Sequence, residues 1–327
     1  MFALSTEITI DTKYVVSSIQ DVSIEKSINT VGSKAVIKLP ASARLRANNK
    51  LQSNSAQTAV IFKRGMPVVI KLGYNSELNT EFVGYISSVG AGSPTVIECE
   101  GQEYLLKQPL APKTFKDATL KDVIDYVVAS KFSVNEDMPV VNLDSFVIKA
   151  GSTALQVFNT IKEHYSLVIN VAGDSLFVGI SEGRKLGEVK YSLNGNECNV
   201  VSDSDLKFRL AEEKKCKVKV VIFSKDNKKK EYEFGDADGE LRTILSRNEK
   251  DSPEDIGKEA LKKMKYTGFD GKIETFLFPY AVPAMVAVIN DTVYTERSGS
   301  YYIISTKTLF STRGGRREVQ LGEKVSI

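Results

Sequence analysis

The chain contains 327 residues, of which 42% are hydrophobic and 26% are charged. This length predicts roughly two or three domains, and the hydrophobic fraction is large enough for each to bury a core. The 44 basic and 41 acidic side chains leave a net charge of +3, which argues against a protein that binds nucleic acid through its overall charge. The longest apolar runs have the length of strands, so no membrane insertion is expected, and the amino terminus lacks the features of a signal peptide.

Residues 1–39 alternate apolar and polar side chains, as in Val36–Leu39, which is typical of a β-meander. The segment Ala41–Gln57 is rich in Asn, Ser and Ala and interrupts this pattern, so we expect a long polar loop there, with room for one helical turn. Strand patterns then resume between glycine-containing turns. We therefore expect a first β-barrel over residues 1–112.

After this barrel the periodicity of the apolar residues changes from two to almost four. Thr119 and Asp122 predict a capped helix whose apolar side chains share one face, and Thr153 and Gln156 predict the cap of a second helix. A hairpin follows the second helix. We expect residues 113–182 to form a small α/β insertion.

Strand patterns return from residue 183 and are interrupted by a helix near residues 253–266, which begins with Ser252 as its cap and Pro253 at its first position. The closing stretch Thr267–Val325 contains strands separated by tight turns. We expect residues 183–327 to form a second β-barrel that includes this helix. The predicted fold class is mainly β (α+β), with two related small β-barrel domains and a small α/β insertion between them.

Two parts of the chain carry a resemblance to a known family: the strand pair Arg64–Tyr74 and Glu81–Ile86, and the closing stretch Thr267–Val325. Together with the helix and hairpin of Ala154–Gly179, they resemble the baseplate hub proteins of contractile phage tails, the late control D family. They are also similar to the amino-terminal hub part of type VI secretion spike proteins. The resemblance extends over nearly the whole chain and lies in the order of its strands, glycines and prolines.

The resemblance implies a structural role without enzymatic activity. Proteins of this family are similar in forming a homotrimeric ring whose paired barrels imitate sixfold symmetry and adapt a hexameric tail tube to a trimeric spike. DNA or cargo could pass through the lumen. Because the sequence stops after the second barrel, we expect the spike to be a separate protein. The chain is expected to be made in the bacterial cytoplasm and to assemble in a phage-like tail or injection particle.

Basic side chains in two segments are the candidate partner-binding residues. The polar loop contributes Arg44, Arg46 and Lys50, and it is either an interface or disordered in the free protein. The end of a lysine-rich span contributes Lys228, Lys229 and Lys230. This span either faces a DNA-filled lumen or an acidic tube surface, or it is a solvated strand face, and its alternation favours the solvated interpretation. Three arginines around the last tight turn are likewise interpreted as solvated charges: Arg313, Arg316 and Arg317.

No motif predicts catalysis, a metal site or a cofactor. His164 lies near the end of a helix without an evident nucleophile, and a cell-wall hydrolase would need a carboxylate pair or zinc ligands that the sequence does not show. Three acidic residues resemble the start of a calcium loop, but the closing glutamate is missing: Asp236, Asp238 and Glu240. The cysteines have no metal spacing and are expected in the core, in a reducing compartment: Cys99, Cys198 and Cys216.

A carbohydrate-binding or adhesin module of a tail tip is the alternative function. Such modules use surface aromatic residues, and the chain has 13 tyrosines. Tyr294, Tyr301 and Tyr302 are the nearest candidates for stacking on sugars. The alternation of Tyr301–Ser305 predicts instead that at least one of these rings is buried.

Overall fold

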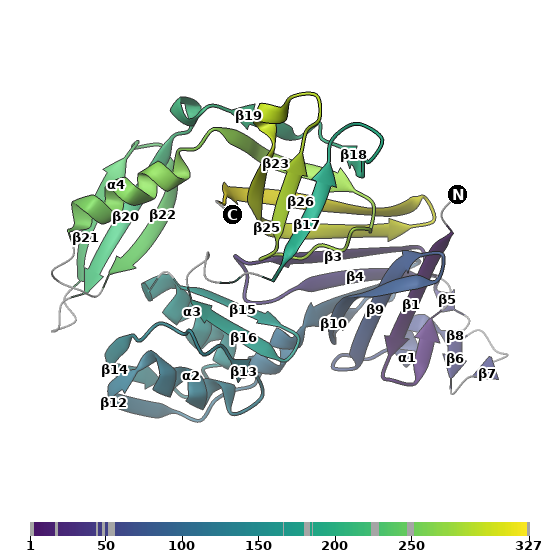
Figure 1. Cartoon of the computed structure of the whole chain (residues 1–327). Helices are drawn as coiled ribbons and strands as arrows, with labels where there is room; N and C mark the ends of the chain where they lie inside the picture. The colour runs from purple at the N-terminus through teal and green to yellow at the C-terminus, as the bar shows by residue number, and fades with distance from the viewer. Residues whose placement is uncertain are drawn as a thin grey trace.

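The computed structural model describes residues 3–16, 19–43, 45–47, 50–51, 56–165, 167–179, 184, 186–223, 229–246 and 252–325. Within these residues the fold is mainly β. Its largest element is a 16-stranded sheet, which four smaller sheets accompany. Figure 1 shows this large sheet in the middle of the molecule, with one lobe below it and a second lobe beside it.

Nine strands of the large sheet come from the first third of the chain, and the seven of them that surround one core are called here the N-terminal half. All their pairings are antiparallel. Along β4 every second side chain is buried, and such side chains from all seven strands meet in one core. The strands are β1 (Leu4–Ile10), β2 (Tyr14–Val16), β3 (Asp21–Ser27), β4 (Lys34–Leu39), β9 (Pro67–Tyr74), β10 (Glu77–Val89) and β11 (Thr95–Gly101).

The expected polar loop is partly structured. Its described residues contain very short strands, of which β6 extends the large sheet by pairing with β2, and one helical turn follows directly after the segment. A long polar loop with room for one helical turn was predicted here, and the described residues form short strands instead. The elements are β5 (Ser42–Ala43), β6 (Leu45–Ala47), β7 (Lys50–Leu51), β8 (Ala56–Gln57) and α1 (Thr58–Ile61).

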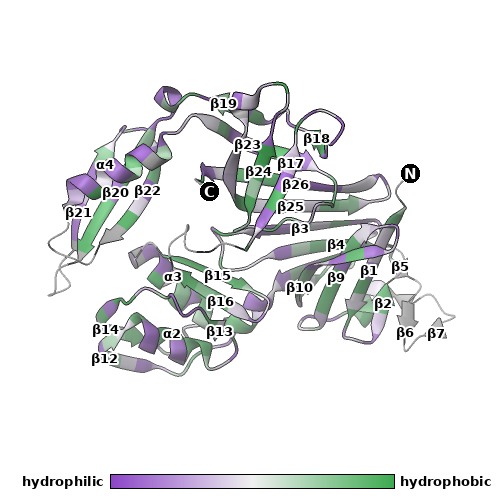
Figure 2. Cartoon of the chain, viewed as in Figure 1, coloured by the Kyte–Doolittle hydropathy of each residue, from purple (hydrophilic) through white to green (hydrophobic). Residues whose placement is uncertain are grey.

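The other strands of the large sheet come from the last part of the chain and are called the C-terminal half. They surround a second core that includes the buried side chains of Tyr191, Phe269 and Tyr301. Hydrophobic residues are spread along the strands of both halves (Figure 2). The strands are β17 (Glu188–Ser192), β18 (Val200–Ser202), β19 (Leu206–Arg209), β23 (Gly268–Thr275), β24 (Val286–Asn290), β25 (Gly299–Ser311) and β26 (Gly314–Lys324).

The two halves repeat one strand order. In the N-terminal half, neighbouring strands of the sheet are β3-β4-β11-β10-β9-β1. In the C-terminal half they are β19-β23-β26-β25-β24-β17. Strands at the same place in these two series also occur in the same order along the chain. The first four pairings are antiparallel in both halves. The last pairing is antiparallel between β9 and β1 and parallel between β24 and β17. Among the described residues no ladder closes either half into a barrel, so the fold is mainly β without an established pair of barrels.

The lobe below the sheet in Figure 1 contains two helices on short strands. Both predicted caps are present. The Asp122 N–H donates to Thr119 Oγ1 at 3.2 Å while Thr119 N–H donates to the Asp122 carboxylate at 2.8 Å, and Thr153 and Gln156 exchange the same two bonds. The elements are β12 (Lys113–Thr119), α2 (Leu120–Val128), β13 (Ser133–Val134), β14 (Asn142–Ile148), α3 (Ala154–Tyr165), β15 (Val168–Ala172) and β16 (Ser175–Gly179). The short helix η1 (Gln102–Lys107) leads into this lobe.

A second lobe contains strands that sequence analysis assigned to the second barrel. In the structure, β20 pairs only with β21 and β22, and none of the three joins the large sheet. The lobe has its own core, in which Cys216, Val218 and Val220 of β20 pack against Ala260 and Met264 of the helix. Its elements are η3 (Ala211–Glu213), β20 (Cys216–Phe223), β21 (Lys229–Gly235), β22 (Glu240–Ser246) and α4 (Pro253–Met264).

Candidate functional site

The junction between the two halves is the feature that makes the large sheet continuous. β25 lies antiparallel to β3 from Ser305 opposite Ser27 to Ser311 opposite Asp21. The ladder joins residues that are almost a whole chain length apart in sequence. Backbone hydrogen bonds therefore connect the halves directly.

A buried ion pair crosses the same junction. The Arg317 guanidinium on β26 donates through Nη2 to the Glu81 carboxylate on β10, and the two side chains are 0% and 1% exposed. Arg317 Nη1 also donates to the carbonyl oxygens of Leu277 at 2.7 Å and Pro279 at 3.1 Å. Removing one partner from a buried pair of this kind costs about 3–5 kcal/mol, because it leaves the other charge buried and unpaired.

The position of Arg317 beside a tight turn predicted a solvated charge, and that interpretation was wrong. Arg317 lies on the same side of β26 as Gly315, Val319 and Leu321, which are all buried. The period of two along this strand was therefore a signal that Arg317 points inward. Its ion-pair partner Glu81 lies 236 residues away in sequence, and no local pattern indicates that contact.

Two tyrosines and a glycine complete the contact. Tyr74 Oη donates to the carbonyl oxygen of Gly315 at 2.8 Å, and Tyr280 Oη donates to that of Thr80 at 3.2 Å. A Cβ atom at Gly315 would lie 2.8 Å from Leu277 Cδ1 and 3.1 Å from Tyr74 Oη. Only glycine lets the strand approach this closely without displacing a neighbour.

Lys26 on β3 adds a further cation beside the ion pair. Its Nζ lies 5.8 Å from the centroid of the Tyr280 ring. Burial lowers the pKa of Lys26 to about 8, the Glu81 carboxylate opposes this shift, and Arg317 adds to it. The junction therefore holds two cations around one carboxylate, and Glu81 is the group on which both depend.

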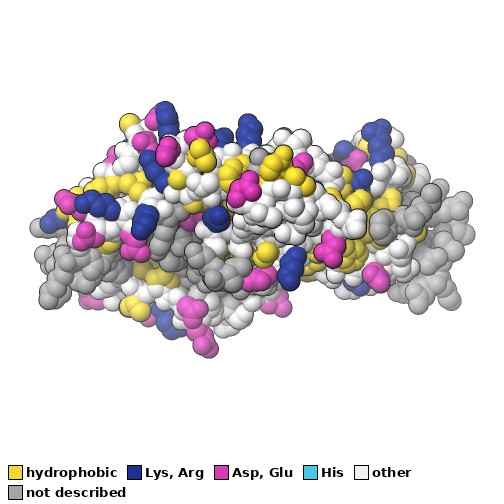
Figure 3. All heavy atoms as spheres, turned by 45° about the horizontal axis from the view of Figure 1, so that its top comes forward, with side chains coloured by type: hydrophobic (Ala, Val, Ile, Leu, Met, Phe, Trp, Pro, Cys, Tyr) yellow, Lys and Arg dark blue, Asp and Glu magenta, His cyan; other side chains and the backbone are white. Residues whose placement is uncertain are grey.

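The open face of the sheet carries an alternating row of charges across the junction. Directly opposed side chains on β11, β4, β3, β25 and β26 form the row Glu100, Lys34, Glu25, Lys307 and Glu318. Lys307 Nζ lies 2.8 Å from Glu25 across the junction itself. Opposite charges at facing positions favour one register over slipped alternatives. Figure 3 likewise shows acidic and basic side chains intermixed over the face it displays.

The predicted basic interface residues come from two separate segments of the chain. Arg44 and Lys228 lie outside the described residues. Arg46 lies on β6, Lys50 on β7 and Lys229 at the start of β21, and the structure describes their backbone only. Lys230 on β21 is exposed. β6 and β7 lie at the opposite end of the molecule from β21 (Figure 1), so these strands do not form one surface on one copy of the chain.

Several other side chains are accounted for by local structure. Cys99 and Cys216 are buried as predicted, whereas the core prediction for Cys198 was wrong because it lies exposed in the turn after β17. The calcium-like carboxylates bind lysines: Asp238 contacts Lys215 Nζ at 2.5 Å, and Asp236 contacts Lys265 Nζ at 2.8 Å. These bonds lower the pKa of both carboxyl groups.

No group of three or more metal-ligating side chains occurs among the described residues. The side chain of His164 lies outside them. Tyr301 and Tyr302 are both buried, which leaves Tyr294, at 48% exposure, as the accessible ring of the three. The buried rings cannot stack on a sugar, so this part of the adhesin interpretation loses its basis.

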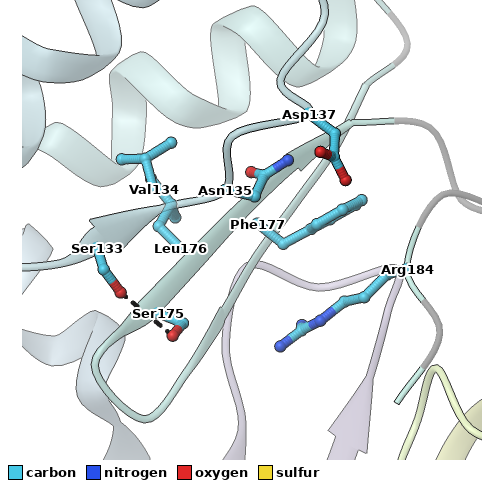
Figure 4. A pocket seen from close by; sticks show the side chains of 8 residues that line it. All are labelled: Ser133, Val134, Asn135, Asp137, Ser175, Leu176, Phe177 and Arg184. Carbon is cyan, nitrogen blue, oxygen red and sulfur yellow. Dashed lines mark hydrogen bonds between the residues drawn. The ribbon is translucent and has the colours of Figure 1, made fainter. Parts of the chain in front are cut away.

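One open hollow of about 310 Å³ lies on the α/β lobe (Figure 4). Its polar groups bond mainly to one another or to nearby backbone. Ser133 Oγ and Ser175 Oγ are 3.3 Å apart, and Arg184 Nη1 donates to Asn170 Oδ1 at 2.7 Å. The lining offers no nucleophile and base in contact and is not a candidate active site. It consists of Ser133, Val134, Asn135, Asp137, Ser175, Leu176, Phe177 and Arg184.

No protein-family model and no curated protein sequence matches this chain. Solved structures do match over nearly its whole length. The tail protein from Neisseria meningitidis MC58 has a TM-score of 0.61 at 13% identity, covering 99% of this chain and 97% of that one. The 43 kDa tail protein of prophage MuSo2 from Shewanella oneidensis has a TM-score of 0.61 at 13% identity, covering 98% of each chain.

A third match is the E. coli c3393 protein, a component of the type VI secretion system that is described as structurally similar to the T4 bacteriophage tail proteins gp27 and gp5. Its TM-score is 0.59 at 8% identity, over 98% of this chain and 77% of that one. At these identities the likeness shows a shared fold. The chain has the fold of phage tail proteins and of this secretion component. None of its described helices is long and apolar enough to cross a membrane.

Proposed function

We propose that the chain is a structural hub of a contractile tail or injection baseplate, related to the late control D proteins. The observation that carries this proposal is the repeated strand order, joined into one continuous sheet by the β3–β25 ladder. A chain with two similar halves presents two similar surfaces at a fixed angle. Three such chains in a ring present six, which is the number needed to meet a hexameric tube.

The buried junction supports a mechanical role. Arg317 and Glu81 fix the angle between the halves through contacts that solvent does not reach. The seven-pair ladder between β3 and β25 resists bending along the same line. An adapter that transmits force from a tube to a spike must be stiff at this joint, and a packed junction is stiffer than a linker.

The proposed partners are a second and third copy of this chain, a hexameric tail tube protein on one face, and a separate trimeric spike protein on the other. The chain would be made in the bacterial cytoplasm and act within the assembled particle, with DNA or cargo in the lumen of the ring. Whole-chain likeness to tail proteins and to a secretion component supports this assignment. No reaction is part of the proposed function.

Light scattering over a range of concentrations, followed by electron microscopy, tests the proposal. We expect a mass of three chains and a ring with six similar outer lobes in projection. Co-expression with a hexameric tail tube protein and a trimeric spike protein should give a stable complex. A monomer at the highest concentration, even with both proteins present, would refute the proposal, and binding of the monomer to a glycan array would favour the adhesin interpretation.

A further inference from the structure

The second lobe, called here the α4 lobe, is an insertion between two neighbouring strands of the large sheet. The chain leaves the sheet after β19 and returns to it at β23, and these two strands pair with each other. The two crossings therefore lie side by side, and the backbone N–H of Ala211 donates to Thr267 Oγ1 at 3.1 Å. Figure 1 shows the lobe standing beside the sheet and connected to it at one end. An insertion connected in this way can turn about its two crossings.

The α4 lobe does not share its core with the sheet in the part of the chain that the structure describes. All side chains of this core come from β20, β21, β22 and α4. The α/β lobe differs, because its core includes Val31 from the turn between β3 and β4. Relative motion is the expectation for two bodies without a large hydrophobic interface. The α4 lobe meets this condition and the α/β lobe does not.

The boundary between the α4 lobe and the sheet falls at a single residue on the return crossing. Met264 packs in the core of the lobe, whereas Tyr266 packs against the second core of the sheet and donates through Oη to the carbonyl oxygen of Gly322 at 2.8 Å. Lys265, between them, has left helical geometry with φ −84° and ψ 79°. On the outgoing crossing, Lys214 Nζ lies 3.4 Å from the centroid of the Tyr266 ring. The two crossings thus meet at Tyr266, which belongs to the sheet.

An ion pair connects the lobe to the sheet beside these crossings. Arg242 Nη1 on β22 donates to both carboxylate oxygens of Glu323 on β26, at 2.6 Å and 2.8 Å. Glu323 follows Gly322, to which Tyr266 is bonded, so the pair lies close to the boundary. The two side chains are 20% and 35% exposed, and solvent reaches them. Salt screens a pair of this kind far more than a buried one.

We propose that the α4 lobe is a hinged arm, which turns about Lys214 and Lys265 and which the Arg242–Glu323 pair holds in the position seen in the structure. The Glu81–Arg317 pair has the opposite character, because both of its side chains are buried and it fixes the two halves of the sheet. One chain thus combines a stiff joint with a joint that can open. The inference does not depend on the proposed hub function.

The strength of the pair sets the size of the expected effect. Loss of an exposed ion pair changes an equilibrium by up to about fivefold, and reversal of one charge adds repulsion to that loss. We therefore expect reversal of either charge to raise the population of the open arm at least about fivefold. Because the pair lies near the hinge, a small opening there becomes a larger displacement at the far end of β20 and β21.

Distances between two spin labels on the whole chain measure this displacement. One label is placed at Lys34→Cys on β4 and the other at Lys230→Cys, at the far end of the arm, and both positions are exposed. Cys198→Ser removes the exposed native thiol. A control pair with the second label at Lys121→Cys on α2 reports on the α/β lobe instead. Both pairs are measured by electron paramagnetic resonance.

Charge reversal and its rescue provide the test. Arg242→Glu and Glu323→Arg should each add a second, shifted distance for the arm, and the two together should restore the distance of the parent protein. Raising the salt concentration should shift the parent in the same direction. Glu233→Arg breaks the pair with Lys217 inside the lobe, where the Nζ–Oε2 distance is 2.7 Å, and should leave the distance unchanged.

The outcomes separate a hinged arm from a rigid lobe and from unfolding. If both single reversals keep the distance of the parent, or if the double variant does not restore it, the hinge is overturned. It is equally overturned if the control pair on α2 shifts as much as the arm. Thermal melting within a few degrees of the parent shows that a shifted distance does not reflect unfolding. An overturned hinge leaves the hub function standing, because light scattering tests that function separately.

Discussion

Replacing Glu81 by Gln tests whether the buried ion pair holds the two halves together. The substitution preserves the shape of the side chain and removes the negative charge of the buried pair. Arg317 keeps its bonds to two carbonyl oxygens but loses its counter-ion in a site that solvent does not reach. Breaking such a pair from one side costs about 3–5 kcal/mol.

Because of Lys26, we expect the decrease in the free energy of unfolding to lie at the lower end of this range. The pKa of Lys26 is about 8, and the Glu81 carboxylate raises it against the effect of burial. Without that carboxylate the pKa of Lys26 falls further, so Lys26 can release its proton near neutral pH and remove one of the two cations around Glu81. We therefore expect Glu81→Gln to lower the free energy of unfolding by about 3 kcal/mol at pH 7.

Urea unfolding at pH 7, followed by circular dichroism and tyrosine fluorescence, measures this loss. The matched control is Glu7→Gln, which breaks an exposed pair with Lys71 whose Nζ–Oε1 distance is 2.7 Å. Exposed pairs contribute about 0–1 kcal/mol. If the two variants lose the same free energy within about 1 kcal/mol, the ion pair does not hold the junction and the reasoning is refuted.

Three further predictions concern single sites. Gly315→Ala should lower the free energy of unfolding by about 1–3 kcal/mol and lower the melting temperature, because the new methyl group meets Leu277. The control Gly90→Ala should change the melting temperature little, because its new Cβ atom would lie 3.5 Å from the nearest atom. Burial raises the pKa of the Glu103 carboxyl group to about 7, so between about pH 4.5 and 7 the folded protein keeps a proton that the unfolded chain releases. The free energy of unfolding should therefore fall as the pH rises through that range. Urea titrations at several pH values should show this slope in the parent protein and not in Glu103→Gln. Thr119→Ala should destabilise α2 by about 1 kcal/mol, seen as faster amide exchange there, and Thr119→Ser should not.

Local features of the structure could be predicted from the sequence. The caps at Thr119 and Thr153 depend on residues three positions apart, and the hairpin between β15 and β16 depends on a single turn. Each cap and the hairpin involve a single short segment, and the side chains of that segment determine its backbone conformation. These predictions were confirmed because no distant part of the chain competes with them.

The assignment of strands to sheets could not be predicted in this way. Apolar and polar side chains alternate along β20, as in any strand with one buried face. This alternation does not determine whether the buried face packs against α4 or against the core of the large sheet. The junction is a stronger case, since Glu81 and Arg317 meet only after the whole sheet has formed. The one signal in the sequence was a charged residue, Arg317, at an inward-facing position of a strand. This pattern indicates that the side chain is buried, but it does not indicate that Glu81 is its partner.

The β3–β25 ladder also has a consequence for the order in which the protein folds during synthesis. β3 leaves the ribosome early, and its partner strand follows roughly 280 residues later. At a synthesis rate of about 5–20 residues per second, one edge of β3 stays unpaired for on the order of 15–60 s after β3 has been made. An open edge of this kind invites pairing with other nascent chains. Asp21, Glu25 and Lys26 place charges along that edge, so they discourage such pairing until β25 arrives.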